Sequence, residues 1–313
     1  KRLHTGLDKD VGAEPPLSMQ GRGLKTGKEK AMEQNRPLTI AIAGMGLIGG
    51  SLGLALKSGT GHTVIGIDID DKVLDAALKA GAADKTGVRH LHEADLLILA
   101  LSPNGAVGFL KENASKLRRG AVVTDVCGVK RSIVEKCLPL CREYGLHFVG
   151  GHPMAGREHS GFSNAVSDLF YGAYYIFTPA ADTPEPVLSM LEKIAYGIGC
   201  AGVTIATPEQ HDRMIAFTSQ LPHALAGAYI KSPQCPEHKG FSAGSYRDVS
   251  RVATVDERLW TQLFMMNADN LCSEIDMLID NLKACRDAID AGDEDRLAGI
   301  LREGRNRKES VTE

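Results

Sequence analysis

One stretch, residues 39–51, constrains the fold more than any other part of the chain. Its first five residues, Thr-Ile-Ala-Ile-Ala, carry no charge and are apolar or β-branched, which is typical of a strand buried on both faces of a parallel sheet. The spacing Gly-x-Gly-x-x-Gly follows at Gly44, Gly46 and Gly49, and good helix formers come next. A strand, a glycine-rich turn and a helix in this order predict a dinucleotide site, with the pyrophosphate on the helix N-terminus.

Each of the three glycines has its own role in such a turn. Gly44 permits the tight turn, Gly46 lets the backbone approach a pyrophosphate, and Gly49 lets the helix pack closely on the strand. The first residues of the helix, Leu47 and Ile48, are expected to contact the cofactor as well, because the free N–H groups and the helix dipole favour an anion there.

An acid at the end of the next strand selects the cofactor. A second apolar strand is predicted over residues 63–68, and it ends in Asp68, about 20 residues after the glycines, where a ribose-binding carboxylate is expected. That carboxylate would accept hydrogen bonds from the adenosine ribose hydroxyls and repel a 2′-phosphate. Residues 69–71 bring no arginine to bind such a phosphate. The sequence therefore predicts NAD rather than NADP; a glycine-rich turn in some other α/β protein is the alternative.

Short apolar strands alternate with helical segments in the first two thirds of the chain. This pattern predicts an α/β protein with a Rossmann-type doubly wound parallel sheet. After the dinucleotide unit, the predicted strands lie at residues 94–101, 121–126, 147–152, 174–178 and 202–206. The predicted helices lie at residues 71–80, 104–118 and 130–143.

The pattern changes after Pro208, where two long helical segments are predicted over residues 209–230 and 256–290. The second carries an apolar stripe and exceeds about 20 residues, the usual limit for a helix of a globular domain. We therefore expect it to pack against a second subunit in a homodimer. The predicted domains are a disordered leader over 1–36, an NAD-binding Rossmann domain over 37–205, and a helical substrate and dimerisation domain over 206–313.

Composition argues against several classes of partner. The net charge is −3, and no basic cluster occurs outside the termini, so no nucleic-acid partner is expected. No apolar run reaches the length of a membrane span, so no membrane partner is expected either. The seven cysteines show no metal-binding spacing and are odd in number. This usage favours reduced thiols in the cytoplasm, with no metal site.

Three segments place reactive side chains where such a fold has its active site. His152 directly follows a predicted strand and is flanked by glycine-rich sequence. His223 follows a proline inside the first long helix, where a kink is expected. Arg251 lies between the long helices. A histidine could accept the proton of an alcohol during hydride transfer, and an arginine could bind a substrate carboxylate. The alternative is that each histidine is a surface or core group, and that Arg251 pairs with Glu158 or Asp248 on the surface.

Five segments together resemble the successive motifs of prephenate dehydrogenases. They lie in that family's order between about residues 37 and 290, and comprise residues 44–51, 125–130, 152–158, 219–223 and 247–253. The resemblance implies NAD-dependent oxidative decarboxylation of prephenate to 4-hydroxyphenylpyruvate, a step towards tyrosine. It also implies a helical C-terminal domain that forms a homodimer.

The same resemblance implies roles for individual residues. His152 would be catalytic and would accept a hydrogen bond from the ring hydroxyl of the substrate. Arg251 would bind a substrate carboxylate, and His223 another polar group. Glu158 and Asp248 match acids that form an ionic network with the arginine near the mouth of the cleft.

The chain departs from the family pattern at one position. Many members carry a serine two residues before Lys130, where it hydrogen-bonds near the catalytic histidine and the substrate hydroxyl, but this chain has Gly128. The neighbouring Cys127 offers only a weak donor. A water or Ser102, which we also expect beside the cofactor, would have to take the role. Lys130 itself either helps to line the substrate cleft or is a solvated lysine at the start of a helix.

Three other functions remain as alternatives. Arogenate dehydrogenase has the same chemistry on a substrate with an ammonium in place of the keto group, and Arg157 favours prephenate only weakly. Another β-hydroxyacid dehydrogenase would usually use a lysine on a long helix, where this chain has His223. A non-enzymatic NAD sensor would need neither His152 nor Arg251.

Overall fold

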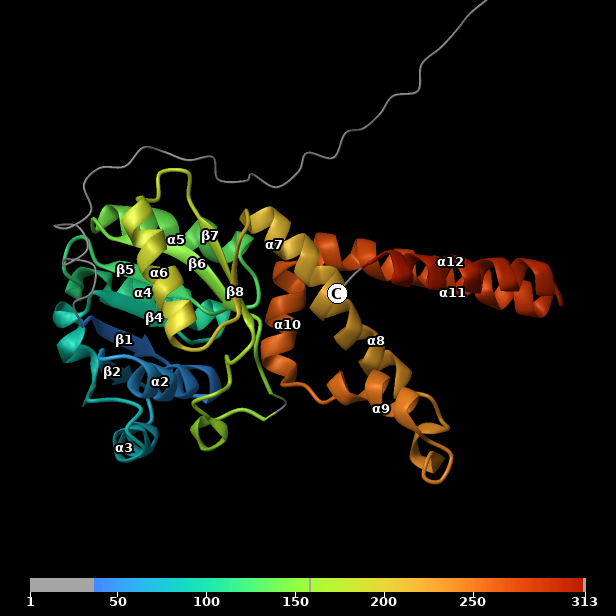
Figure 1. Cartoon of the computed structure of the whole chain (residues 1–313), viewed down its shortest axis with the longest axis horizontal. Coiled ribbons are helices and arrows are strands. Elements are labelled where there is room, and N and C mark those ends of the chain that lie inside the picture. Colours follow the sequence, from blue (N-terminus) through green and yellow to red (C-terminus); the bar gives the residue numbers. More distant parts are fainter. Residues whose placement is uncertain (1–36, 158, 312–313) are drawn as a thin grey trace, which may run out of the picture. The chain divides into compact units, whose positions relative to one another are not determined.

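The computed structural model describes residues 37–157 and 159–311 (Figure 1). The leader predicted over residues 1–36 and the candidate Glu158 lie outside the described residues. The described residues belong to one compact unit.

The described residues form one eight-stranded sheet in the order β3-β2-β1-β4-β5-β6-β7-β8. β1 pairs in parallel with β2 on one side and with β4 on the other, so the strand order reverses beside β1. In such sheets the ligand crevice lies outside the carboxyl ends of the strands at this reversal. The strands are β1 (Thr39–Ala43), β2 (Thr63–Ile67), β3 (Lys85–Thr86), β4 (Leu96–Leu99), β5 (Val122–Asp125), β6 (His147–Pro153), β7 (Tyr174–Pro179) and β8 (Gly202–Ile205).

Helices cover both faces of the sheet, as the largely apolar central strands β1, β2 and β4 require. Alternate residues of β1 point to opposite faces: Ile40 and Ile42 belong to one buried cluster and Ala41 and Ala43 to another. The first cluster includes side chains of α2 (Leu47–Gly59), α3 (Asp71–Lys79) and α6 (Glu185–Gly197). The second includes side chains of α4 (Pro103–Asn113) and α5 (Arg131–Glu143). The predicted Rossmann-type fold is confirmed.

One strand breaks the expected parallel order. β7 runs antiparallel to β6, and its residue Ile176 pairs with His152. A parallel partner would require a crossover that returns the chain to the opposite end of the sheet, usually a helix. Among the described residues between these strands, the only helical piece is a short 3₁₀ turn, η3 (Phe162–Asn164). The chain therefore turns back at the end of the sheet where β6 finishes. β3, which is only two residues long, was not predicted.

The first long helical segment is interrupted. The structure has α7 (Pro208–Ile215), a π-helical turn at Ala216–Gln220, and α8 (Leu221–Tyr229) in place of one helix. Pro222 falls in the first turn of α8, immediately after the π turn. Proline has no N–H to donate to the preceding turn, and the change of helix type at this point tolerates the missing hydrogen bond. Such π turns often occur at functional sites.

The second long segment is two helices rather than one, which corrects the single helix expected over residues 256–290. α10 (Glu257–Met266) and α11 (Ala268–Asp290) meet at Asn267, whose φ of −128° and ψ of 28° are not helical. The buried Asn267 amide donates to the Asp212 carbonyl and to Gln220 Oε1, at 2.8 Å each. We attribute the break to these contacts with α7 and the π turn, because they fix the Asn267 side chain between the two helices.

A short helix, α9 (Gly244–Ser250), lies between the long segments, and α12 (Glu294–Ser310) packs on α11 at the end of the described chain. α12 was not predicted. The predicted domain boundary near residue 205 falls in the link between β8 and α7, and it stays a prediction. None of the helices in the described part of the chain is long and apolar enough to cross a membrane.

Candidate active site

The glycine-rich turn has the shape that a dinucleotide requires. Gly44 has a φ of 92°, and a Cβ there would lie 2.3 Å from the Ala100 carbonyl oxygen. A Cβ on Gly49 would lie 1.8 Å from the carbonyl oxygen of Gly44. Gly46, the N-cap of α2, is different, because nothing lies within 4 Å of the position of its Cβ. The space in front of the α2 N-terminus is thus open where a pyrophosphate would bind.

Asp68 follows β2 and is fixed beside this turn. Its Oδ2 accepts the N–H of Met45 at 2.8 Å, and its Oδ1 accepts the N–H of Asp70 at 3.1 Å. Leu47 and Ile48 are the first two residues of α2, whose first turn carries no acidic residue. Their N–H groups precede the first i to i−4 hydrogen bond of the helix. These residues therefore fit an anionic cofactor with a ribose near Asp68.

Ser102 lies just after β4 and caps α4 through the N–H of Gly105, which its Oγ accepts at 3.3 Å. The hydroxyl accepts in this cap, and its own hydrogen stays available to donate. Its expected roles beside the cofactor and in place of the family serine stay predictions.

His152 lies near the carboxyl end of β6 and is partly buried. Its Nδ1 lies 2.9 Å from Nε2 of His211, and the two rings meet edge to face. Burial is the main cause that lowers the pKa of His152 well below its usual range, and His211 and the Lys130 cation lower it further. His152 is therefore neutral near pH 7 and has a lone pair with which to accept a proton.

A buried ion pair joins the end of β5 to the N-terminus of α5. The ammonium of Lys130 contacts Oδ2 of Asp125, and both side chains are completely buried. Asp125 also accepts the N–H of Gly151 at 3.1 Å and the N–H of Cys127 at 2.9 Å. The expectation that Lys130 lines the substrate cleft or is solvated is therefore corrected. Lys130 neutralises Asp125 instead, because an unpaired carboxylate would be very costly at that depth.

Gly128 lies beside both His152 and α10. A Cβ at this position would lie 3.4 and 3.6 Å from the two Leu263 methyl carbons and 4.0 Å from Cε1 of His152. These are ordinary contact distances, so the Cβ of a serine would fit at this position. The missing family hydroxyl would thus have been close to the catalytic candidate.

His223 and Arg251 form a second group, which meets α10 at Trp260. The His223 ring stacks on Trp260 with the centroids 3.7 Å apart, and its Nδ1 lies 2.8 Å from the Ser219 carbonyl oxygen. Burial lowers the pKa of His223; the hydrogen bond to Ser219 raises it in part, and the charge of Arg251 lowers it further. α8, which carries His223, packs against the 3₁₀ turn η6 (Arg251–Ala253), so the structure brings the two residues into one region.

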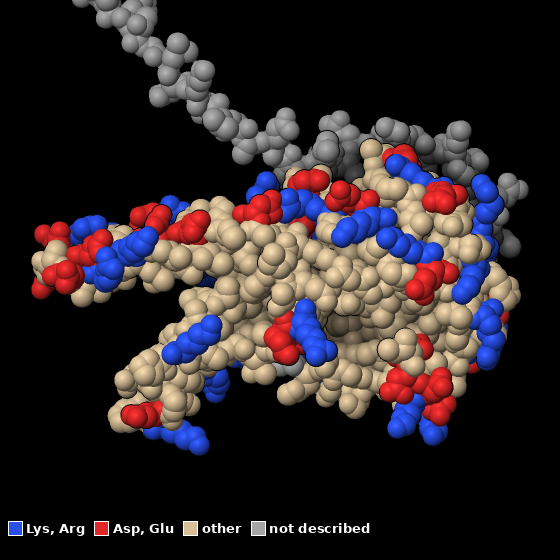
Figure 2. All heavy atoms as spheres, turned by 180° about the vertical axis from the view of Figure 1, so that it is seen from behind, with Lys and Arg blue, Asp and Glu red and all other residues tan. Residues whose placement is uncertain are grey.

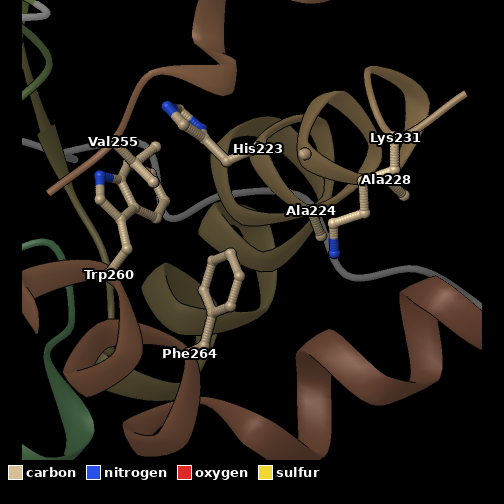
Figure 3. A pocket seen from close by; sticks show the side chains of 8 residues that line it. His223, Ala224, Ala228, Lys231, Val255, Trp260 and Phe264 are labelled. Carbon is tan, nitrogen blue, oxygen red and sulfur yellow. The ribbon is translucent and has the colours of Figure 1, made fainter. Parts of the chain in front are cut away.

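A cavity of about 340 Å³ opens beside this second group (Figure 3). Its walls are mostly apolar, with His223 and Lys231 as the polar exceptions. Trp260 and Phe264 of α10 face α8 across it (Figure 3). Asp248 is exposed on α9, about one helical turn before Arg251. α10 lies beside both groups, because Leu263 is near Gly128 and Trp260 stacks on His223.

Sequence reasoning missed His211 and Asp212, which lie on α7 behind His152. Both side chains are almost completely buried: His211 is 2% exposed and Asp212 0%. In the sequence the pair is an ordinary polar dipeptide in an amphipathic helix. The one available signal was that two polar side chains occur next to each other on the side of the predicted helix that faces the sheet. Such a position would have indicated a buried hydrogen bond between polar groups.

Two family models match the chain. The model described as the prephenate dehydrogenase nucleotide-binding domain matches residues 52–204, and the one described as the prephenate dehydrogenase dimerization domain matches residues 207–303. A prephenate dehydrogenase of Bacillus subtilis is 31% identical over 286 residues, which cover 87% of this chain and 76% of that protein.

Solved structures show the same similarity. A prephenate dehydrogenase from A. aeolicus, in complex with hydroxyphenyl propionate and NAD+, superposes with a TM-score of 0.75 at 28% identity. The match covers 88% of this chain and 99% of that one. An arogenate dehydrogenase from Synechocystis superposes with a TM-score of 0.73 at 27% identity, covering 88% of this chain and 100% of that one.

Proposed function

We propose that this chain, which belongs to the prephenate dehydrogenase family, catalyses the NAD-dependent oxidative decarboxylation of prephenate to 4-hydroxyphenylpyruvate. One observation carries the proposal beyond membership of the family. A neutral histidine, His152, stands at the carboxyl end of the sheet that carries the dinucleotide turn. An alcohol oxidised at this edge of the sheet would therefore find a base within the same crevice.

The residues of the chain would act on the two ends of the substrate. NAD, when bound, supplies the acceptor for the hydride that leaves the carbinol carbon. His152 accepts the hydrogen bond of the ring hydroxyl and takes up its proton as the carbon–oxygen bond gains double-bond character. Loss of CO2 then makes the ring aromatic, and the oxygen regains a proton.

Substrate carboxylates need cations or donors at a distance from this base. Arg251 presents a guanidinium, whose fork matches a carboxylate. His223 lies near Arg251 and borders the cavity beside Trp260. We propose that these two side chains bind the substrate, with Asp248 and Glu158 as acids that pair with the arginine.

Turnover assays test this function directly. We expect NADH absorbance to rise with prephenate and NAD, and to rise much less with arogenate. The arogenate dehydrogenase of Synechocystis and a cyclohexadienyl dehydrogenase of Zymomonas mobilis, which is 31% identical, make arogenate the substrate to compare. Higher kcat/KM with arogenate would reverse the assignment, and no turnover of either would refute it.

The Asp68 carboxylate should set the choice of cofactor. Hydrogen bonds to a charged group contribute about 1.5–3 kcal/mol, so Asp68→Ala should narrow the preference for NAD over NADP by at least about tenfold. Asp71→Ala, which removes a neighbouring acid in the first turn of α3, should leave the preference unchanged. Equal kcat/KM with NADP and NAD in the unaltered protein would show that Asp68 does not contact the ribose.

We propose that α10 and α11 join two copies of the chain in a homodimer. The matched dimerization model includes both helices. In the single chain, large apolar side chains of these helices are exposed to water, and a second copy could cover them. These include Met265, Met277, Leu282 and Ile289, with 72%, 57%, 56% and 64% of their surface exposed.

On the face shown in Figure 2, acidic and basic side chains are interspersed rather than gathered into a field of one sign. We expect sedimentation at micromolar concentration to give a dimer; a stable monomer would contradict the proposal.

A further inference from the structure

A second histidine lies behind His152 and has no part in the chemistry proposed above. His211 belongs to α7, and its Nε2 lies 2.9 Å from Nδ1 of His152. On the other edge of the same ring, Nδ1 of His211 lies 2.8 Å from Oδ1 of Asp212. The three side chains thus form one hydrogen-bonded row, which leads from a buried carboxylate to the candidate base.

The carboxylate at the end of the row is held as an anion. Oδ1 of Asp212 accepts the N–H of Lys130 at 2.7 Å, and Oδ2 accepts the N–H of Arg131 at 2.9 Å. Burial raises the pKa of Asp212, but the hydrogen bonds from His211 and from these two N–H groups outweigh it, so its pKa is lowered overall. An ionised carboxylate can only accept, so Nδ1 of His211 must carry the hydrogen that joins them.

The state of His211 then determines the state of His152. Burial lowers the pKa of His211, while its hydrogen bond with Asp212 raises it in part and the Lys130 cation lowers it again. His211 is therefore neutral, with its hydrogen on Nδ1 and a bare Nε2. A bare nitrogen can only accept, so Nδ1 of His152 must be the donor across the 2.9 Å contact.

We infer that His211, held by Asp212, is a positioning residue that fixes His152 in the tautomer with hydrogen on Nδ1 and a lone pair on Nε2. The inference rests on the proposed function, because that lone pair is the one that accepts the substrate hydroxyl. An unconstrained imidazole would populate both tautomers and several ring orientations, and only one of these would be productive. The nearby Lys130 does not compete for the ring, because its ammonium pairs with Asp125.

The row also spans two parts of the fold. His152 lies on β6, whereas His211 and Asp212 lie on α7, and Asp212 is bound to the N-terminus of α5. Arg131 adds a further link, since its guanidinium contacts both Asp212 and Asp269 of α11. The tautomer of the base is therefore set only when the helical part of the chain is docked on the sheet.

Substitution of His211 tests the role by the split between kcat and KM. His211→Phe retains a ring but removes the acceptor, and we expect kcat to fall by about 10- to 100-fold, as when a metal-binding histidine loses the partner that orients it. KM and NADH binding should stay near the parent values. His211→Gln places an amide oxygen near the former Nε2, so it should recover most of the lost kcat.

A matched control is available at another histidine–carboxylate pair. Nδ1 of His90 lies 2.7 Å from Oε1 of Glu93 on the 3₁₀ helix η1 (Val88–Glu93), which is not part of the site. His90→Phe should leave kcat unchanged. Parent-like kcat in His211→Phe would overturn the inference, as would a His211→Gln variant no better than His211→Phe.

A measurement on the unaltered protein covers the case in which His211→Phe does not fold. With ¹⁵N-labelled histidine, NMR at neutral pH should show His152 protonated at Nδ1 and bare at Nε2, with assignments from His152→Asn and His211→Gln. A hydrogen on Nε2 of His152 would overturn the inference. This result does not depend on turnover: an enzyme with the expected tautomer but no activity on prephenate would refute the proposed function alone.

Discussion

We expect His152→Asn to lower kcat for prephenate by roughly 10²–10⁴-fold, the loss typical of a missing acid–base group. Asparagine is shorter than histidine, so its amide can take the place of Nδ1 beside His211 but provides no acceptor at the position of Nε2. The variant thus keeps the contact with α7 and loses only the base. Steady-state kinetics with the purified variant measure the effect, and a kcat near the parent value would show that another group accepts the proton.

The pH profile of the parent enzyme provides a second signature. The pKa of His152 lies well below its usual range, chiefly because the ring is buried. The neutral form is the active one, so activity is lost as pH falls through this lowered pKa. We therefore expect full activity near pH 6.5, where an ordinary histidine would be about half protonated. An acidic limb at that pH, or the same limb in His152→Asn, would contradict the role of this residue.

Arg251→Ala distinguishes substrate binding from chemistry. A substrate carboxylate is charged both before and during the reaction, so its guanidinium partner contributes equally to ground and transition states. We expect this variant mainly to raise KM, whereas His152→Asn mainly lowers kcat. The opposite pattern would exchange the two roles.

The sequence was sufficient for the parts of the fold whose causes are local. The turn from Gly44 to Gly49 and the acid at Asp68 belong to one βαβ unit, and contacts within or beside that unit require glycine at positions 44 and 49. The predicted sheet and its cofactor turn follow from short-range patterns of this kind. The roles of the individual site residues stay predictions, since they depend on a bound substrate.

The features that the sequence missed depend on contacts between distant residues. The N–H of Lys130 bonds to Asp212, which lies 82 residues further along the chain. Asn267 interrupts a continuous apolar stripe, and its amide donates a hydrogen bond to the carbonyl of Asp212, which lies 55 residues earlier in the chain. Neither periodicity nor helix propensity contains such information. Likewise, the sequence pattern at a helix start predicts a solvated lysine, whereas the surrounding structure buries the Lys130 side chain completely.

We expect Lys130→Met to lower the free energy of unfolding by about 3–5 kcal/mol, since it removes one partner of a buried ion pair. The methionine can fill much of the space, so the loss reflects mainly the charge left on Asp125. That carboxylate is completely buried, and without Lys130 it loses its cationic partner but still accepts the N–H groups of Gly151 and Cys127. Because domains are typically stable by only about 5–15 kcal/mol, the effect should be plain in urea unfolding curves.

The same substitution at an exposed lysine separates this effect from the loss of a charge alone. Lys283 of α11 pairs with Asp280 at 3.3 Å, and both side chains are more than half exposed. Lys283→Met should therefore change stability by less than about 0.5 kcal/mol. Lys130→Met should also move the acidic limb of activity to higher pH, because the Lys130 cation is one of the causes that lower the pKa of His152. If the two lysine variants were equally stable, the Asp125 charge would not destabilise the fold when Lys130 is removed. An unmoved acidic limb would mean that the ion pair has no electrostatic effect on His152.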